Sequence, residues 1–286
     1  MKASIWDSHQ NFLGEGPVAY GPGNNQVAWV DILGKTVHEK NFASGSRNSF
    51  TMEEDISFVI PRTQGGFILG TVNGPLARDV DGKTHALPIR EETSTNPTRW
   101  NDAKVSPYGD LWLGTMAYGA IPNQGALYKL NKDSSTLSKE VTGITISNGL
   151  AWSADKKTMF YIDTMTFGID AFDFQESGIS NRRRVWQGND AEFGAPDGMC
   201  IDTDDGLWVA FWGGSCVRRF DSNFKITELI EIPAPHVTSC AFVGPDLKTL
   251  IITSAHNGDT NTFPEAGMTF MATPGVTGTK STLFPS

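Results

Sequence analysis

Three residues with oxygen-bearing side chains share a local setting in this sequence. Glu15, Asn148 and Asp197 are each followed directly by a glycine. Two carboxylates and one amide form an all-oxygen donor set, which suits Ca²⁺, Mg²⁺ or Mn²⁺ and does not exclude Zn²⁺. If the fold brings the three side chains together, they predict one divalent metal site with coordination positions left for water and substrate.

The chain repeats one pattern six times, and each copy opens on a small polar or acidic residue. A short apolar run follows, then a turn rich in Gly and Asp, then a second apolar run. The copies open at Glu15, Ser57, Asn101, Asn148, Asp197 and Ser239. Apolar runs around such turns indicate β-hairpins, and a spacing of about 40 to 50 residues is typical of propeller blades. The sequence therefore predicts an all-β, six-bladed β-propeller.

The register of the repeats predicts where the three oxygen-bearing side chains lie. If every copy supplies the innermost strand of its blade, the opening residues form a ring at one mouth of the central tunnel. Glu15, Asn148 and Asp197 then lie on that ring. Asn-Gly and Asp-Gly are also the commonest tight-turn dipeptides, so Asn148 and Asp197 could alternatively serve only to make turns. For Glu15 the alternative is a turn cap or an ion pair with a neighbouring lysine.

Length and composition fit a single β-propeller domain spanning residues 1–286. The chain, of 31.1 kDa, has a length that one propeller uses, and the repeats leave no room for a second domain. Its 30 Gly and 15 Pro favour many short strands and tight turns over long helices. Apolar stretches at 3–6 and 268–271 predict strands from both chain ends that close the ring.

Net charge, hydropathy and cysteine content indicate which classes of binding partner and which compartment to expect. A net charge of −9 and a pI near 5.0 argue against nucleic-acid binding, and the basic run at 182–184 is short. No apolar stretch reaches the length of a membrane span, and the N-terminus lacks the apolar region of a secretory signal. The three cysteines, at 200, 216 and 240, predict reduced thiols in a cytoplasmic protein. The sequence leaves self-association open.

Four motifs, in order and at blade spacing, carry a resemblance to a known family. They are GEGP at 14–17, RWNDAKVSPYGDLWLGTM at 99–116, SNGLAWSADKKTMFYIDT at 147–164 and APDGMCIDTDDGLWVAFWGG at 195–214. From about residue 13 to 255 the chain resembles the gluconolactonase/senescence-marker-protein (regucalcin-like) family of six-bladed propeller lactonases. The resemblance implies a divalent metal held by Glu15, Asn148 and Asp197. It also implies that Arg99 and Asn101 face a sugar-lactone substrate.

The sequence departs from the family pattern at two places. Ala103 stands where the family commonly has glycine, a change small enough to leave the strand intact. Animal members carry acidic residues just after the GTMA motif, one of which touches the sugar, whereas this chain has Tyr118 and Gly119. We therefore expect a differently shaped substrate pocket, and the resemblance does not identify the lactone.

The expected activity is hydrolysis of a sugar-acid lactone (aldonolactone) to the free aldonic acid. The metal would polarise the lactone carbonyl, and Asp197 would act as general base toward the attacking water. Arg99 would offer its donors to the substrate or pair with an acid such as Glu92. Asn101 would donate to ring hydroxyls or to a metal-bound water, or would only form a turn. Asp102 is expected to brace the strand or the ligands. Alternative functions are hydrolysis of another ester or phosphotriester, and a non-enzymatic calcium-binding or interaction propeller.

Overall fold

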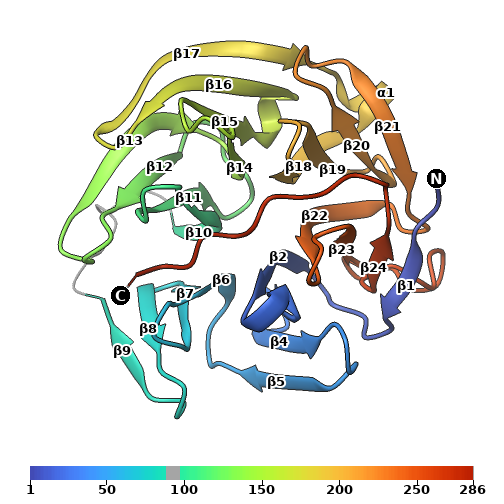
Figure 1. Ribbon diagram of the computed structural model, residues 1–286, viewed down its shortest axis with the longest axis horizontal. Coiled ribbons are helices and arrows are strands. Elements are labelled where there is room, and N and C mark those ends of the chain that lie inside the picture. The colour runs from blue at the N-terminus through green and yellow to red at the C-terminus, as the bar shows by residue number, and fades with distance from the viewer. Residues whose placement is uncertain (88–96, 286) are drawn as a thin grey trace.

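Antiparallel β-sheets arranged around a central axis make up almost all of the chain. The computed structural model describes residues 1–87 and 97–285, and Figure 1 shows their sheets set like blades around the middle of the ring. Within these residues the helical elements are α1 (Asp190–Phe193) and the 3-10 turns η1 (Pro22–Asn24) and η2 (Thr164–Thr166). The prediction of an all-β propeller with very little helix is confirmed.

Four of the sheets contain four strands each, and the strands follow chain order across each sheet. The first two sheets contain β2 (Gly14–Tyr20), β3 (Gln26–Asp31), β4 (Thr36–Asn41) and β5 (Arg47–Thr51), then β6 (Ile56–Pro61), β7 (Phe67–Thr71), β8 (Gly74–Arg78) and β9 (Thr84–Ala86). The next two contain β10 (Thr98–Val105), β11 (Leu111–Ala117), β12 (Gly125–Leu130) and β13 (Leu137–Ile144), then β14 (Ser147–Trp152), β15 (Thr158–Asp163), β16 (Gly168–Gln175) and β17 (Gly178–Gln187).

A fifth sheet has eight strands and consists of two halves. One half contains β18 (Ala195–Ile201), β19 (Leu207–Trp212), β20 (Cys216–Phe220) and β21 (Ile226–Glu231), and the other contains β22 (His236–Val243), β23 (Thr249–Ala255), β24 (Thr269–Ala272) and β1 (Ser4–Asp7). A single residue pair, Trp212 with His236, joins β19 to β22 and thereby the two halves. Because β1 pairs with β24, strands from both chain ends complete the ring, as predicted.

The opening residues of the sequence repeats all fall in β2, β6, β10, β14, β18 and β22. These innermost strands pack against one another in that order, and β22 packs against β2, so that they form a closed ring around the axis. Apolar side chains fill the spaces between neighbouring sheets. Strands such as β11 and β14 are consequently buried along their whole length, and in β11 this explains the near-continuous apolar sequence.

The C-terminal segment covers one end of the tunnel. Figure 1 shows this segment crossing the middle of the ring. The backbone N–H of Thr279 donates to the carbonyl oxygen of Ile201 at 3.1 Å, and that of Phe284 donates to the carbonyl oxygen of Pro61 at 2.9 Å. Both acceptors lie at the ends of innermost strands, away from the opening residues. Between the segment and the later halves of these strands lies a cavity of about 320 Å³.

The structure describes both the basic run at 182–184 and the three cysteines. In the basic run, Arg182 and Arg184 pair with Asp170 and Arg183 pairs with Asp173, so each guanidinium faces an acid of the neighbouring strand. The three cysteines are free, as predicted. Over residues 1–87 and 97–285, no helix has the length and apolar character that crossing a membrane requires.

Candidate active site

The predicted site residues lie where the innermost strands depart from regular pairing. In β2 the pairing with β3 shifts between Glu15 and Val18. Similar shifts enclose Asn101 in β10, Asn148 in β14 and Asp197 in β18. A β-bulge releases a residue from the ladder and re-aims its side chain, and bulges are frequent next to active sites. The repeated irregularity therefore turns equivalent residues of several strands toward one region of the ring.

The glycines that follow Asn148 and Asp197 do not form hairpin turns. Gly149 lies within β14, and Gly198 lies within β18. A Cβ on Gly149 would lie 2.7 Å from the carbonyl oxygen of Asp197, and a Cβ on Gly198 would lie 2.2 Å from Oγ of Ser239. These glycines allow neighbouring innermost strands to approach closely, so the interpretation of the two dipeptides as turns is wrong.

A chain of hydrogen bonds links three of the predicted residues. Arg99 Nη1 donates to Asn101 Oδ1 at 2.8 Å and to the carbonyl oxygen of Trp100 at 2.9 Å. Asn101 Nδ2 donates to Asn148 Oδ1 at 3.1 Å and to the carbonyl oxygen of Ser147 at 2.8 Å. The structure thus brings Arg99, Asn101 and Asn148 together. Both side-chain N–H donors of Asn101 are engaged within the protein.

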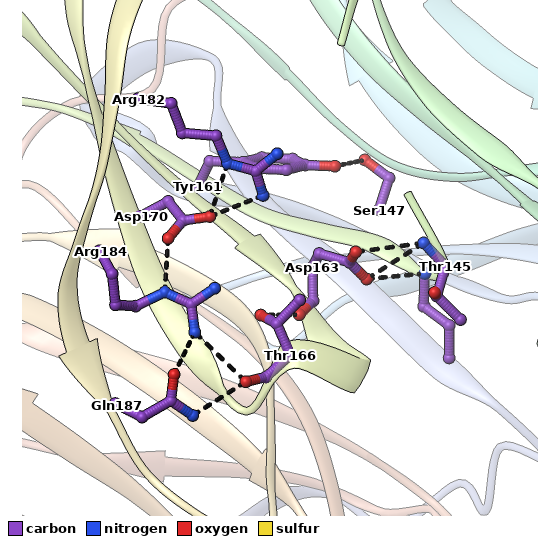
Figure 2. Close-up of polar contacts among 10 residues, drawn as sticks. Thr145, Ser147, Tyr161, Asp163, Thr166, Asp170, Arg182, Arg184 and Gln187 are labelled. Atoms are coloured by element: carbon purple, nitrogen blue, oxygen red, sulfur yellow. Dashed lines mark hydrogen bonds and ion pairs between the residues drawn. The ribbon is translucent and has the colours of Figure 1, made fainter. Parts of the chain in front are cut away.

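The sheet formed by β14 to β17 supports Asn148 from behind. Asn148 Nδ2 donates to Thr164 Oγ1 in η2 at 2.9 Å. Asp163 accepts hydrogen bonds of 3.0 to 3.3 Å from backbone N–H groups of the turn before β14. The hydroxyl of Tyr161 donates to Ser147 Oγ at 2.7 Å. Figure 2 shows the contacts of Asp163 and of Tyr161. The start of β14, and with it the amide of Asn148, is therefore fixed by side chains of its own sheet.

Glu15 and Asp197 are acids whose negative charge is not fully compensated. Asp197 is 5% exposed, and its Oδ1 has no hydrogen-bond partner in the described part of the chain. Burial and the carboxylates of Glu15 and Asp102 raise the pKa of Asp197 well above its usual range. Burial and Asp102 likewise raise the pKa of Glu15. Acids held together away from water favour either protonation or the binding of a cation.

Two cationic side chains lie near these acids. Burial lowers the pKa of the Arg99 guanidinium, whereas its interaction with Glu15 and Asp197 opposes that change. Lys104 Nζ donates to a backbone carbonyl oxygen of β18 at 2.6 Å. The Lys104 side chain, which comes from β10, therefore reaches across the tunnel. Burial raises the pKa of Asp102, and the charge of Lys104 opposes the rise. Lys104 therefore stabilises the charged form of Asp102, and Asp102 in turn repels the carboxylates of Glu15 and Asp197.

The residues present fit a hard divalent cation. Over residues 1–87 and 97–285, no group of three or more His, Cys, Asp or Glu side chains is arranged to hold a metal ion. The predicted set contains two such residues, because its third member, Asn148, contributes an amide oxygen. A cation bound to Glu15 and Asp197 would satisfy the unpartnered Oδ1 of Asp197 and relieve the repulsion between the two acids. The ligand set stays a prediction.

Sequence reasoning missed Asp55 and Thr164. Arg99 interacts electrostatically with Asp55 and with Tyr118. Asp55 precedes the opening residue of the second repeat by two positions, so the repeat register carried a signal for it. Thr164 belongs to η2, for which the repeat pattern gives no signal. Glu92, the alternative partner considered for Arg99, lies outside the described residues.

Comparison with known proteins settles the family. The model of the SMP-30/gluconolactonase/LRE-like region matches residues 13–256. The chain belongs to this family. The assignment confirms the resemblance that the four motifs carry, and it supports hydrolysis of sugar lactones at the level of the family.

Individual family members are similar over nearly the whole chain. The regucalcin of Danio rerio is 38% identical and covers 96% of this chain and 94% of its own length. YvrE of Bacillus subtilis, named provisionally as a sugar lactone lactonase, is 35% identical and covers 89% of this chain and 87% of its own. The solved structure of a regucalcin from Agrobacterium tumefaciens, described as a calcium-binding protein, has a TM-score of 0.92 at 26% identity and covers 100% of this chain and 98% of its own.

Proposed function

We propose that this protein hydrolyses a sugar-acid lactone to the free aldonic acid with the help of one divalent cation. The observation that carries the proposal is the buried, unpartnered Oδ1 of Asp197 on the same ring as Glu15 and Asn148, in a chain of the gluconolactonase family. Ca²⁺, Mg²⁺, Mn²⁺ and Zn²⁺ all accept such ligands.

Glu15, Asn148 and Asp197 would hold the cation through oxygen atoms. When bound, the cation supplies Lewis acidity toward a carbonyl oxygen and stabilises the negative charge that develops on it. Asn148 Oδ1 accepts one hydrogen bond from Asn101, and a carbonyl oxygen has a second lone pair for a cation. The contact of Asn148 Nδ2 with Thr164 fixes which face of the amide points to the site.

Asp197 is the proposed general base. With one oxygen of its carboxylate on the cation, the other would accept a proton from the water whose oxygen attacks the carbonyl carbon of the lactone. When the bond from that carbon to the ring oxygen breaks, the same carboxyl would return the proton to the departing oxygen. The products are a carboxylic acid and a hydroxyl group on one open chain.

Arg99 and Asn101 are the proposed substrate-binding residues. Arg99 uses Nη1 on Asn101 and on a backbone carbonyl, so its other N–H groups would contact substrate oxygens. Asn101 holds Arg99 on one side and Asn148 on the other. Since both of its own N–H donors are engaged, its effect on the substrate would come from Oδ1 and from the placement of its two neighbours.

We count six blades in the ring. The four four-stranded sheets and the two halves of the eight-stranded sheet make six units of four strands. Strand pairing between β19 and β22 is limited to Trp212 and His236, and each half has its own innermost strand. This count supports a ring of six opening residues around one tunnel mouth.

A calcium-binding protein without catalysis is the second candidate. The A. tumefaciens regucalcin is described as calcium-binding, and carboxylate and amide oxygens suit Ca²⁺. Hydrolysis of another ester or of a phosphotriester would use the same site. The charged donors of Arg99 beside the ligands favour an enzyme, because a purely structural cation has no use for them.

We also place the protein in the cytoplasm, because its three cysteines are free. The net charge of −9 supports a small-molecule substrate over a nucleic-acid partner.

The test is a hydrolysis assay on EDTA-stripped protein with a pH indicator and a panel of aldonolactones, to which single metals are added back. The proposal expects turnover with at least one metal and none without metal. Tight metal binding without hydrolysis of any lactone, ester or phosphotriester would favour the calcium-binding alternative. Full activity after complete metal removal would contradict the role of the cation.

A further inference from the structure

Two cysteine side chains on neighbouring innermost strands are in contact. Cys200 lies in β18 and Cys240 lies in β22, and their sulfur atoms are 3.6 Å apart. The two strands pack against each other in the ring. Their backbones are close beside the cysteines, because a Cβ on Gly198 would lie 2.2 Å from Oγ of Ser239. The two thiols therefore meet across the boundary between the two halves of the eight-stranded sheet.

The hydrogen bonds of this pair run in one direction. The thiol of Cys240 donates to the carbonyl oxygen of Trp208 at 3.3 Å. Because a thiol has a single hydrogen, the contact between the sulfurs uses the S–H of Cys200 as donor and a lone pair of Cys240 Sγ as acceptor. A lone pair of Cys240 thus points at the Cys200 sulfur. This is the arrangement that a sulfur nucleophile needs to attack an oxidised Cys200.

A cavity brings small molecules to the pair. Both cysteines line the cavity of about 320 Å³ between the C-terminal segment and the innermost strands. Cys200 is partly exposed, whereas Cys240 is 2% exposed. Residues 279–282 of the C-terminal segment line the same cavity and cover this end of the tunnel. A reagent little larger than water fits into this space and meets Cys200 first.

The surroundings of Cys200 slow its oxidation. Burial raises the pKa of the Cys200 thiol well above its usual range, and the charge of Lys104 opposes the rise. Lys104 Nζ donates to the carbonyl oxygen of Met199, the residue before Cys200, at 2.6 Å. The thiolate is the form that reacts with oxidants. We therefore expect the pair to stay reduced unless an oxidant is present for a prolonged time.

We propose that Cys200 and Cys240 are an oxidation site that forms a disulfide with a peroxide as the oxidant. With hydrogen peroxide, the Cys200 sulfur attacks one oxygen and the O–O bond breaks. The departing hydroxide takes up the Cys200 proton, which gives a sulfenic acid and one water. The Cys240 sulfur then attacks the Cys200 sulfur, and the S–O bond breaks. Hydroxide leaves with the Cys240 proton as a second water, so two thiols lose two electrons to one peroxide.

The disulfide would join the two halves of the eight-stranded sheet close to the tunnel axis. Strand pairing between β19 and β22 is limited to Trp212 and His236. A bond between cysteines 40 positions apart in the chain restricts the unfolded state. We expect it to raise the thermal midpoint by about 4 to 8 °C. This inference goes beyond the proposed hydrolysis and does not depend on it.

The experiment treats the full-length protein with hydrogen peroxide over hours, then denatures it and blocks the remaining thiols with iodoacetamide. Peptides are mapped by mass spectrometry without reduction, and thermal unfolding is followed in a parallel sample. We expect a linked peptide pair that contains Cys200 and Cys240, loss of both of their alkylated forms, and a raised thermal midpoint. Dithiothreitol should reverse all three changes.

Cys216→Ser is the matched control. Cys216 is a buried thiol in β20, which lies two strands outward from β18. Two strand spacings of about 4.8 Å exceed the distance of about 4.4 to 6.8 Å between Cα atoms that a disulfide spans. This variant should form the linked pair like the wild type. Cys200→Ser should form no linked pair and should keep both of its remaining thiols open to iodoacetamide.

Peroxide treatment that leaves Cys200 and Cys240 fully alkylated would overturn the inference. Oxidation of Cys200 to the sulfinic acid without a linked peptide would do the same, because Cys240 would then fail to reach the oxidised sulfur. A linked peptide that contains Cys216, or one that joins two chains, would also contradict it. Because no lactone enters the experiment, each of these results leaves the proposed hydrolysis untouched.

Discussion

The two ends of strand β18 carry two buried aspartates in opposite electrostatic states. Asp202, directly after the strand, is fully buried, and its carboxylate accepts from Arg219 Nε at 2.7 Å, Trp208 Nε1 at 2.9 Å and the N–H of Gly206 at 2.8 Å. Burial pushes its pKa up, but these hydrogen bonds outweigh burial and the pKa is lowered. Asp197, near the other end, has a raised pKa and an unpartnered Oδ1.

This difference assigns Asp202 to the stability of the fold and Asp197 to function, although the two residues lie at the ends of one strand. A buried acid whose oxygens are all paired contributes to folding, and replacing it leaves its partners unsatisfied. A buried acid that lacks a partner is held by the rest of the fold and is available to a ligand or a proton. Asp197 and Asp202 are both buried aspartates. Their roles follow from what surrounds the carboxylate.

The largest expected effect is on catalysis at Asp197. Asp197→Asn keeps the size of the side chain but removes the proposed base and an anionic ligand. Turnover should fall by about a hundred- to ten-thousand-fold. The thermal midpoint of the metal-free protein should stay the same or rise, because one of several mutually repelling acids is gone. A large loss of thermal stability together with normal turnover would reverse the assignment of the two aspartates.

At the other end of the strand, Asp202→Asn should act on stability. Removing the negative charge leaves Arg219, with a side chain 12% exposed, without its counter-charge. We expect a loss of about 3 to 5 kcal/mol in the free energy of unfolding, measured by urea denaturation. Metal affinity of the folded fraction should be unchanged. The control is Asp204→Asn, an exposed acid in the same turn, which should change stability by less than about 0.5 kcal/mol.

The contribution of Asp202 should also depend on pH. Its pKa is lowered in the folded state, so its stabilisation is fully present above the unfolded pKa of about 4 and is lost as the pH falls through the lower folded value. Urea midpoints of the wild type and Asp202→Asn should therefore converge as the pH is lowered from 6 toward 2. A gap between the two proteins that stays constant over this range would show that ionisation of Asp202 contributes nothing.

A smaller effect is expected at Gly198, which follows Asp197. The added Cβ of Gly198→Ala would press on Oγ of Ser239 and on the carbonyl oxygen of Thr238, at 2.2 and 2.9 Å, so β18 and β22 would have to separate. We expect a loss of about 1 to 3 kcal/mol in unfolding free energy and weaker metal binding. Calorimetric unfolding indistinguishable from the wild type would show that the close approach of these strands is dispensable.

The propeller fold could be predicted from the sequence because each repeat contains its own turn residues and apolar runs. The sequence also placed Glu15, Asn148 and Asp197 on equivalent strands, although their status as ligands is still a prediction. It could not reveal that Gly149 and Gly198 serve strand approach, because a dipeptide looks the same in a turn and in a bulge.

Contacts between sheets could not be predicted from the sequence either. The bond from Asn101 to Asn148 joins residues on neighbouring sheets. Such contacts depend on how far each strand is shifted along the axis. No local pattern of residues encodes that shift.

The most direct test of the difference between the ends of β18 is a calorimetric titration of Mn²⁺ into EDTA-stripped protein, for the wild type, Asp197→Asn and Asp204→Asn. We expect one cation per chain in the wild type and in Asp204→Asn. In Asp197→Asn we expect at least a ten-fold weaker affinity, because a charged ligand is replaced by a neutral one. Equal stoichiometry and equal affinity in all three proteins would contradict the claim that the unpartnered aspartate holds the metal.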